Sequence, residues 1–288
     1  MAQFNLPALS LAVIKDGEIV KSEGYGLADR ERKVPATRDT VYKIGSISKQ
    51  FIATGIMLLV NERRLTLDDP VAKHLTDAPA AWKPITVRHL LTHTSGLPRE
   101  SPAFDPMQNR SDRELLSALH AVPLRFVPGE KWEYSNSGYI ALAEIIRVAS
   151  GQPWADFLHQ RVFAPAGMNA TMPTNTQAVI ANRASGYTSN DNQCKAPEWV
   201  ALRASGAFLS SVVDLAKWEA LLYTDKILDG AARKQMWTRA RLNDGTTAAY
   251  GLGWFYSSNR LIRALSPKEK RARLVRKWSG SLIPYVNF

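Results

Sequence analysis

The stretch from Val41 to Phe51 constrains the fold of this chain more than any other. Its first residues predict a short strand that ends at Ile44, and Gly45 predicts a sharp corner after it. A helix is then expected to begin at or beside Ser46 and to continue to about residue 62. Apolar residues lie on nearly every side of this helix, which is typical of a buried helix. The chain must therefore place a strand-to-helix corner inside a packed core.

Ser46 and Lys49 are three residues apart, so their side chains lie on one face of that helix, one turn apart. A serine hydroxyl becomes a nucleophile when a nearby base takes its proton. The positive end of a helix and partial burial both lower the pKa of a lysine, which makes a neutral amine available as that base. The spacing predicts an activated serine, although Ser-x-x-Lys also arises by chance in chains of this length.

A second candidate motif is Tyr134-Ser135-Asn136, which follows a predicted turn and precedes a helix expected to end at Gly151. A tyrosine relays a proton when a nearby cation such as Lys49 favours its phenolate. The asparagine amide both donates and accepts hydrogen bonds, so it suits a substrate amide or the lysine. Helix capping uses the same residue types, and the motif alone leaves both interpretations open.

The elements near the two ends of the chain are predicted strands, and those between them are mostly helices. Residues 9–20 alternate like a hairpin around Asp16-Gly17, a favoured two-residue turn. Residues 250–256 predict a strand after the turn at Asp244-Gly245. Helix starts are predicted at the capping residues Thr86, Ser111 and Ser211, and a further helix is predicted to run from Asp229 to about Arg239.

This order predicts an α+β fold with two lobes. Residues 1–66 and 200–288 are expected to form a discontinuous sheet lobe, and residues 67–199 a mainly helical lobe inserted between them. Clefts usually form where such parts meet, so the site is expected at the junction.

Composition excludes several classes of protein. Hydrophobic residues make up 45% of the chain, enough for a large core, and no apolar run approaches the roughly 20 residues of a membrane helix. The single cysteine, Cys194, excludes an internal disulfide and a cysteine-based metal site. The first residues lack the basic segment of a signal peptide, which predicts a cytoplasmic protein. A periplasmic or secreted protein is expected instead if a leader was removed.

The net charge of +11 is concentrated near the end of the chain. Between Arg260 and Lys277 lie eight cations and one anion, a surplus of seven, which leaves +4 for the rest. The rest of the chain contains no basic stripe with interleaved aromatic residues, so nucleic-acid binding is not expected.

His89 and His93 are four residues apart, which is a spacing for a metal pair on a helix. The glutamate of a His-Glu-x-x-His motif is absent between them, and the sequence suggests no third ligand. We therefore expect neither a metal nor a cofactor. The sequence also lacks a Gly-x-Ser-x-Gly elbow, which disfavours an α/β-hydrolase.

Together, Ser46-x-x-Lys49 and Tyr134-Ser135-Asn136 resemble the motifs of the penicillin-recognising serine hydrolase superfamily, which includes class C β-lactamases, D,D-peptidases and family VIII carboxylesterases. The resemblance extends from about residue 7 to residue 256. It implies a β-lactamase/transpeptidase-like fold, in which an antiparallel sheet is flanked by helices. Further segments that resemble family landmarks, in family order, are residues 9–26, 42–51, 65–70, 85–97, 126–138, 163–168 and 250–254.

The third motif of this superfamily is Lys-Thr-Gly, His-x-Gly or Trp-x-Gly on an edge strand beside the serine. Its best match here is Trp278-Ser279-Gly280, followed by Ser281, whose N–H would complete the oxyanion hole. Only eight residues follow Gly280, whereas the family continues with a strand and a helix. A truncated or out-of-frame C-terminus and a divergent one both fit this observation. Trp278 in place of a cation favours an uncharged ester over a substrate carboxylate.

The resemblance implies a mechanism in which Ser46 attacks an ester or amide carbonyl while Lys49 and Tyr134 share the role of base. The N–H groups of Ser46 and Ser281 would stabilise the oxyanion, and Asn136 would hold the substrate or Lys49. We therefore predict a serine esterase that acts on small molecules without a cofactor. A β-lactamase or D,D-peptidase-like amidase is one alternative. The other is a member impaired by an incomplete oxyanion strand, whose basic tail would bind an anionic partner.

Overall fold

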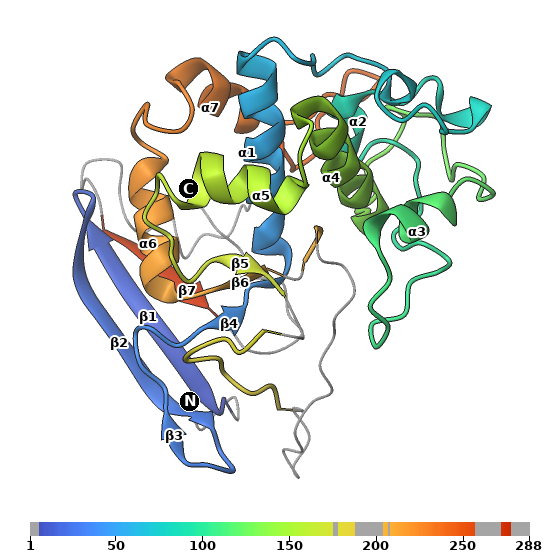
Figure 1. The fold of residues 1–288 in the computed structure, drawn as a ribbon. Helices are drawn as coiled ribbons and strands as arrows, with labels where there is room; N and C mark the ends of the chain where they lie inside the picture. Colours follow the sequence, from blue (N-terminus) through green and yellow to red (C-terminus); the bar gives the residue numbers. More distant parts are fainter. Residues whose placement is uncertain (1–5, 175–177, 188–203, 207, 257–271, 278–288) are drawn as a thin grey trace.

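The structure consists of two antiparallel sheets and a group of helices, several of which pack on one another away from the sheets (Figure 1). It is a computed structural model that describes residues 6–174, 178–187, 204–206 and 208–256, together with the backbone of residues 272–277. The larger sheet has the strand order β3-β2-β1-β7. Its strands are β1 (Ala8–Lys15), β2 (Glu18–Asp29), β3 (Val34–Pro35) and β7 (Ala272–Lys277).

The predicted N-terminal hairpin is confirmed as β1 and β2. Asp16 and Gly17 form its turn with φ of 53° and 87°, the two left-handed residues that a type I′ turn requires. Alternate residues of β1 are buried, as the period of a strand dictates. Among them, Ala12 and Ile14 pack against residues of α6 (Val212–Leu221). This helix therefore covers one face of the larger sheet (Figure 1).

The smaller sheet supports the predicted corner. It has the order β4-β6-β5, with β4 at Tyr42–Lys43, β6 at Phe208–Ser210 and β5 at Met172–Pro173. Immediately after β4, the Ile44 N–H donates to the carbonyl of Phe208 at 3.0 Å. The residues before the corner are thus fixed to a segment more than 160 positions later in the chain.

Helix α1 (Ser48–Asn61) is the buried central helix that the sequence predicts, and a 3₁₀ turn at Gly45–Ile47 precedes it. It lies against α4 (Asn136–Ser150) and α5 (Trp154–Leu158) (Figure 1). Gly55 permits this approach, since a Cβ there would lie 2.9 Å from a methyl group of Leu158. One turn before Gly55, on nearly the same face of α1, the ring of Phe51 contacts the rings of Phe163, Phe208 and Trp218.

The remaining helices begin at the predicted starts, and in each the first side chain caps the helix by accepting a backbone N–H. These are Thr86 for α2 (Val87–Leu91), Ser111 for α3 (Asp112–Ser117), Ser211 for α6 and Asp229 for α7 (Gly230–Met236). Shorter turns lie at Val71–Lys73, Ala80–Trp82 and His159–Phe163. No helix in the described part of the chain has the length and apolar character needed to cross a membrane. The division into lobes at residues 66 and 200 stays a prediction.

The strand predicted for residues 250–256 is wrong. The structure has only an isolated bridge there, between Tyr250 and Phe255. The chain turns at Gly253, whose φ is 83°, and Gly251 packs so closely that a Cβ would lie 2.4 Å from the carbonyl oxygen of Met236. The two glycines thus form a tight turn against the end of α7 instead of a strand.

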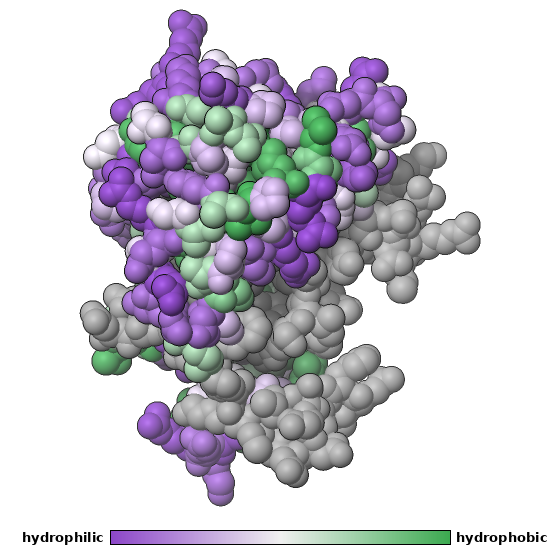
Figure 2. Space-filling view, turned by 90° about the vertical axis from the view of Figure 1, so that its right-hand side faces the viewer, coloured by the Kyte–Doolittle hydropathy of each residue, from purple (hydrophilic) through white to green (hydrophobic). Residues whose placement is uncertain are grey.

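Apolar residues on the face of the molecule in Figure 2 form small groups among hydrophilic ones. The exposed large apolar side chains belong to several separate segments, for example Val20 on β2, Val127 in a loop and Val148 on α4. Single exposed apolar residues of this kind are normal and indicate no particular partner.

Candidate active site

Ser46 lies in the 3₁₀ turn between β4 and α1, at the predicted corner. Gly45 makes the corner with a φ of 53°, in the left-handed region. The hydroxyl of Ser48 donates to the carbonyl of Gly45 at 2.6 Å and accepts the N–H of Phe208 at 3.2 Å. These bonds tie the turn to β6, so Ser46 stands on a rigid part of the fold.

Two side chains from two helix starts contact Ser46, and a third holds one of them. The Tyr134 hydroxyl donates to Ser46 Oγ at 2.6 Å, and Lys49 Nζ lies 3.4 Å from the same oxygen. Lys49 Nζ also donates to Asn136 Oδ1 at 2.7 Å and to the carbonyl oxygen of Ser205 at 2.6 Å. The structure therefore brings together Ser46, Lys49, Tyr134 and Asn136, the four predicted site residues that lie within its described part.

Lys49 is buried, with only 1% of its surface exposed. Burial lowers its pKa to about 7, the nearby Glu100 carboxylate opposes this effect, and the Arg99 guanidinium reinforces it. Its Nζ lies over the rings of Tyr134 and Tyr139, 4.7 Å and 5.3 Å from their centroids. A substantial fraction of Lys49 is thus a neutral amine at neutral pH.

The contacts of Lys49 leave its lone pair for Ser46. A neutral amine has two N–H bonds and one lone pair, and the two shortest contacts of Nζ are to the oxygens of Asn136 and Ser205, which only accept. Both N–H bonds are therefore occupied. The lone pair is left for the remaining contact, with Ser46 Oγ, so the amine can accept the serine proton.

The surroundings of Tyr134 do not favour the phenolate that the relay of a proton was expected to use. Burial raises its pKa to about 12, although the hydrogen bond with Ser46 acts in the opposite direction. The tyrosine is therefore a neutral phenol at neutral pH, because its loss of hydration outweighs the favourable contact. Among the pair that was expected to share the role of base, Lys49 is the stronger candidate.

Glu100 and Arg99 are neighbours of the site that the sequence did not indicate. Asn136 Nδ2 donates to Glu100 Oε1 at 2.6 Å, which turns the amide oxygen of Asn136 toward Lys49. The carbonyl of Arg99 accepts the N–H of Asn136 at 2.8 Å, and its guanidinium lies 5.3 Å from the ring centroid of Tyr134. Their only sequence signal is a pair of opposite charges directly after Pro98, in a loop.

Ser205 is a third contributor that sequence reasoning missed. It acts through its backbone carbonyl, and any residue type supplies that group, so no motif marks it. Its neighbour Gly206 lies close to Gly45, since a Cβ at Gly206 would be 3.8 Å from the carbonyl carbon of Gly45. This approach brings the carbonyl of Ser205 to the corner that carries Ser46.

The predicted third motif, Trp278, Gly280 and Ser281, lies outside the described residues. The strand directly before it is described: β7 pairs with β1 in antiparallel register, from Lys15 opposite Ala272 to Ser10 opposite Lys277. It is the last strand in the order β3-β2-β1-β7. The roles of the three residues stay predictions.

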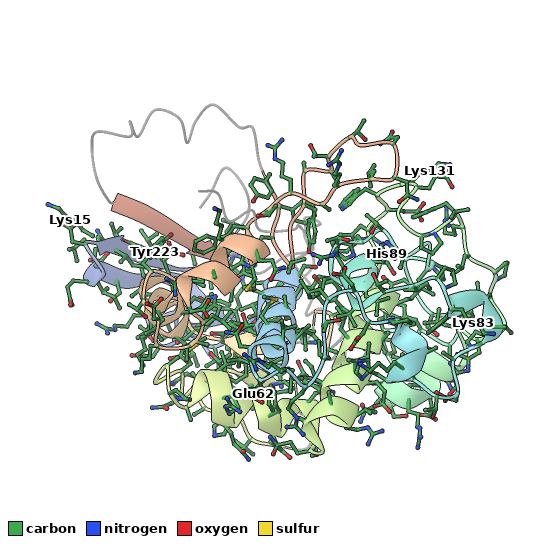
Figure 3. All side chains as sticks on the ribbon, turned by 90° about the horizontal axis from the view of Figure 1, so that it is seen from above. Lys15, Glu62, Lys83, His89, Lys131 and Tyr223 are labelled. Carbon is green, nitrogen blue, oxygen red and sulfur yellow. The ribbon has the colours of Figure 1, made fainter. Side chains whose placement is uncertain are left out.

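The two histidines have separate partners. His89 Nδ1 accepts the N–H of Thr86 at 3.2 Å and completes the cap of α2, whereas His93 Nδ1 accepts the N–H of Ser135 at 3.1 Å. In Figure 3, His89 lies among other side chains, whereas Lys83 and Lys131 lie at the edge of the molecule. No group of three or more His, Cys, Asp or Glu side chains within the described ranges is arranged to hold a metal ion.

Comparison with known proteins identifies a family model, described as Beta-lactamase, that matches residues 1–280. Penicillin-binding protein 4* of Bacillus subtilis (strain 168) is 32% identical over 273 residues, which cover 88% of this chain and 59% of that protein. The chain spans between 53% and 60% of the length of the curated relatives that it matches first.

Two solved structures resemble this one closely. The octameric penicillin-binding protein homologue from Pyrococcus abyssi has a TM-score of 0.78 at 31% identity, with 91% of this chain and 63% of that chain covered. The D-amino acid amidase from Ochrobactrum anthropi SV3, in complex with D-phenylalanine, has a TM-score of 0.76 at 29% identity, with 88% and 77% covered. These similarities confirm the predicted β-lactamase/transpeptidase-like fold.

Proposed function

Because the chain belongs to the beta-lactamase family of serine hydrolases, we propose that it cleaves small carboxylic esters through an acyl-enzyme on Ser46. One observation carries this proposal: Ser46 Oγ accepts a hydrogen bond from the Tyr134 hydroxyl at 2.6 Å, and the buried amine of Lys49 lies 3.4 Å from the same oxygen. The serine thus has a proton acceptor and a proton donor at the same oxygen, which nucleophilic catalysis requires.

In the acylation step, the neutral Lys49 amine takes the proton of Ser46 as Oγ attacks the ester carbonyl carbon. The carbonyl electrons move to oxygen, and the N–H of Ser46 donates to the oxyanion; we assign the second donor to the N–H of Ser281. When the tetrahedral intermediate collapses, the bond to the leaving oxygen breaks. The phenol of Tyr134 protonates that oxygen, and the Lys49 ammonium restores the phenol.

Deacylation repeats these steps with water in place of the serine. The neutral Lys49 amine takes a proton from the water as the water attacks the acyl carbon. When the intermediate collapses, the Tyr134 phenol gives a proton to the departing Ser46 oxygen and regains one from the Lys49 ammonium. Asn136 holds Lys49 Nζ in place throughout, since its amide is itself fixed by Glu100.

Esters are the preferred substrate class because their oxygen leaving groups need less protonation than the nitrogen of an amide. The predicted Trp278 beside the serine also favours an uncharged group over a carboxylate. Amide hydrolysis is the second candidate, supported by the similarity to the D-amino acid amidase. A neutral Tyr134 phenol suits this reaction too, because an amine leaves only after it gains a proton.

A fluorophosphonate probe tests the proposal. We expect labelling of the wild-type protein that disappears in Ser46→Ala and remains in Ser117→Ala, a control at an exposed serine. Turnover of p-nitrophenyl butyrate, a chromogenic cephalosporin and D-phenylalanine amide then separates ester from amide preference. Labelling without turnover of any substrate supports a member impaired in its oxyanion strand. Absence of labelling in folded protein contradicts the proposal.

A further inference from the structure

His93 is held inside the protein in an unusual backbone conformation. Its φ of 61° lies in the left-handed region, which only a few per cent of non-glycine residues adopt, and only 1% of its surface is exposed. A conformation of this kind persists where the surrounding contacts fix it. The contacts of His93 therefore indicate its role.

Two hydrogen bonds connect His93 to the residues on either side of Tyr134. The carbonyl oxygen of His93 accepts the N–H of Glu133 at 2.9 Å, and its ring Nδ1 accepts the N–H of Ser135 at 3.1 Å. The left-handed backbone allows one residue to make both contacts, with its main chain and with its side chain. The segment that carries Tyr134 is thus fixed just before and just after the tyrosine.

The ring of His93 also packs against the ring of Tyr134. Their centroids are 4.4 Å apart, and His93 is packed in turn against Tyr250 at 4.6 Å and Tyr139 at 5.2 Å. Phe255 stacks on Tyr134 with an interplanar angle of 14°. The imidazole is therefore one wall of an aromatic enclosure that directs the Tyr134 hydroxyl toward Ser46.

We propose that His93 is the positioning residue for Tyr134 and that it acts as a neutral hydrogen-bond acceptor. The inference rests on the proposed function, because it assigns to His93 the alignment of a group that acts in catalysis. His93 makes no contact with the reacting oxygen of Ser46, so this histidine acts only through the loop and the ring of Tyr134.

The neutral state follows from the direction of the hydrogen bond. Because Nδ1 accepts the Ser135 N–H, the ring proton is on Nε2, which is buried and has no hydrogen-bond partner among the described residues. Protonation of Nδ1 would set two donors against each other. Burial and the nearby cations Lys49 and Arg99 also hold the pKa of His93 well below its usual value, and the Ser135 hydrogen bond only partly opposes them.

A double-mutant cycle tests whether His93 acts through Tyr134. His93→Gly removes the ring and the acceptor while tolerating the left-handed backbone, and His93→Leu removes the acceptor at similar volume. His93→Asn is the conservative variant, since its Oδ1 can replace Nδ1 and asparagine tolerates positive φ. Each is measured in the wild-type and Tyr134→Phe backgrounds as kcat and KM for p-nitrophenyl butyrate, with thermal unfolding as the control for folding.

In the wild-type background, we expect His93→Gly to lower kcat/KM about 10- to 100-fold, mainly through kcat, as for a misplaced catalytic group. His93→Asn should recover at least half of that loss on a logarithmic scale. In the Tyr134→Phe background, removal of His93 should change kcat/KM by less than about threefold, because the hydroxyl to be positioned is gone.

An equal loss in both backgrounds, or a folded His93→Asn as impaired as the folded removal variants, would overturn the proposal. If His93→Gly does not fold, His93→Leu provides the same comparison. If neither folds, the activity of His93→Asn relative to its own parent is measured in the wild-type and in the Tyr134→Phe background. Equal relative activities well below one in the two backgrounds would overturn the proposal. A wild-type protein that turns over no ester contradicts the proposed function instead, so the two failures are distinguishable.

Discussion

The side-chain oxygen of Asn136 accepts a hydrogen bond from Lys49 Nζ at 2.7 Å, although 87 positions separate the two residues. Together with the carbonyl of Ser205, it occupies two N–H bonds of the buried amine. A charged Lys49 has a third N–H and no lone pair, so it would be only a donor toward Ser46. The protonation state of Lys49 therefore decides whether Ser46 has a base.

The rate of acylation should rise with pH through the pKa of Lys49. Burial lowers this pKa to about 7. Below it the lysine is charged and cannot take the serine proton; above it the amine is neutral and can. We expect kcat/KM for a neutral ester to rise tenfold per pH unit at acidic pH and to level off above about pH 8. A profile that is flat from about pH 5 to pH 9 would contradict the role of Lys49 as base.

Substitutions at Glu100 and Arg99 should shift this profile in opposite directions. The Glu100 carboxylate raises the pKa of Lys49, and the Arg99 guanidinium lowers it. Glu100→Gln keeps an oxygen to accept from Asn136 but removes the charge, so the midpoint should move to lower pH. Arg99→Gln should move it to higher pH, by less, because the Arg99 side chain is 61% exposed and water screens its charge.

The matched pair supplies its own control. Both variants replace a charged residue with glutamine at adjacent positions, so a general effect of substitution in this loop would move both midpoints in the same direction. Parallel shifts, or no shift within error for Glu100→Gln, would count against electrostatic control of Lys49 from this loop.

The features that the sequence predicted well depend on neighbours in the chain. The corner at Gly45, the turn at Asp16-Gly17, the caps of the helices and the end of α4 at Gly151 are all observed. Each follows from the conformational preference of one residue or from a hydrogen bond to a residue two or three positions away. Such preferences are visible in a single sequence.

The features that escaped prediction depend on residues far apart in the chain. Ser205 contributes a backbone carbonyl, and Glu100 reaches Asn136 from a loop without periodicity. The pKa order of Lys49 and Tyr134 depends on how deeply each is buried. Residues 250–256 alternate like a strand, but the close approach of Gly251 to Met236 makes them a turn. Only the packed structure contains this information.

Ser48→Ala should destabilise the protein more than its small change in volume suggests. The Ser48 hydroxyl accepts the buried N–H of Phe208 and donates to the carbonyl of Gly45. Alanine leaves that N–H without a partner, which costs about 1–3 kcal/mol. Chemical denaturation should show this loss, and Ser117→Ala, at an exposed helical position, should stay within about 0.5 kcal/mol of wild type. Equal stabilities of the two variants would contradict the importance of this link between β6 and the corner.

Gly96→Ala should be far more damaging than Gly151→Ala, although both glycines have nearly the same φ angle. Their φ angles are 79° and 78°, so an alanine meets the same left-handed strain of about 1–2 kcal/mol at either position. A Cβ at Gly151 has no atom within 4 Å, whereas at Gly96 it would lie 2.3 Å from the carbonyl oxygen of Phe126. That contact would force apart the loop before Arg99 and the loop that leads to Tyr134. We therefore expect Gly96→Ala to lose at least about 3 kcal/mol of unfolding free energy. Ester turnover should fall as well, because the two loops carry residues of the site. Denaturant titration of both variants measures the difference, and a loss at Gly96 no greater than that at Gly151 would mean that the two loops are free to separate.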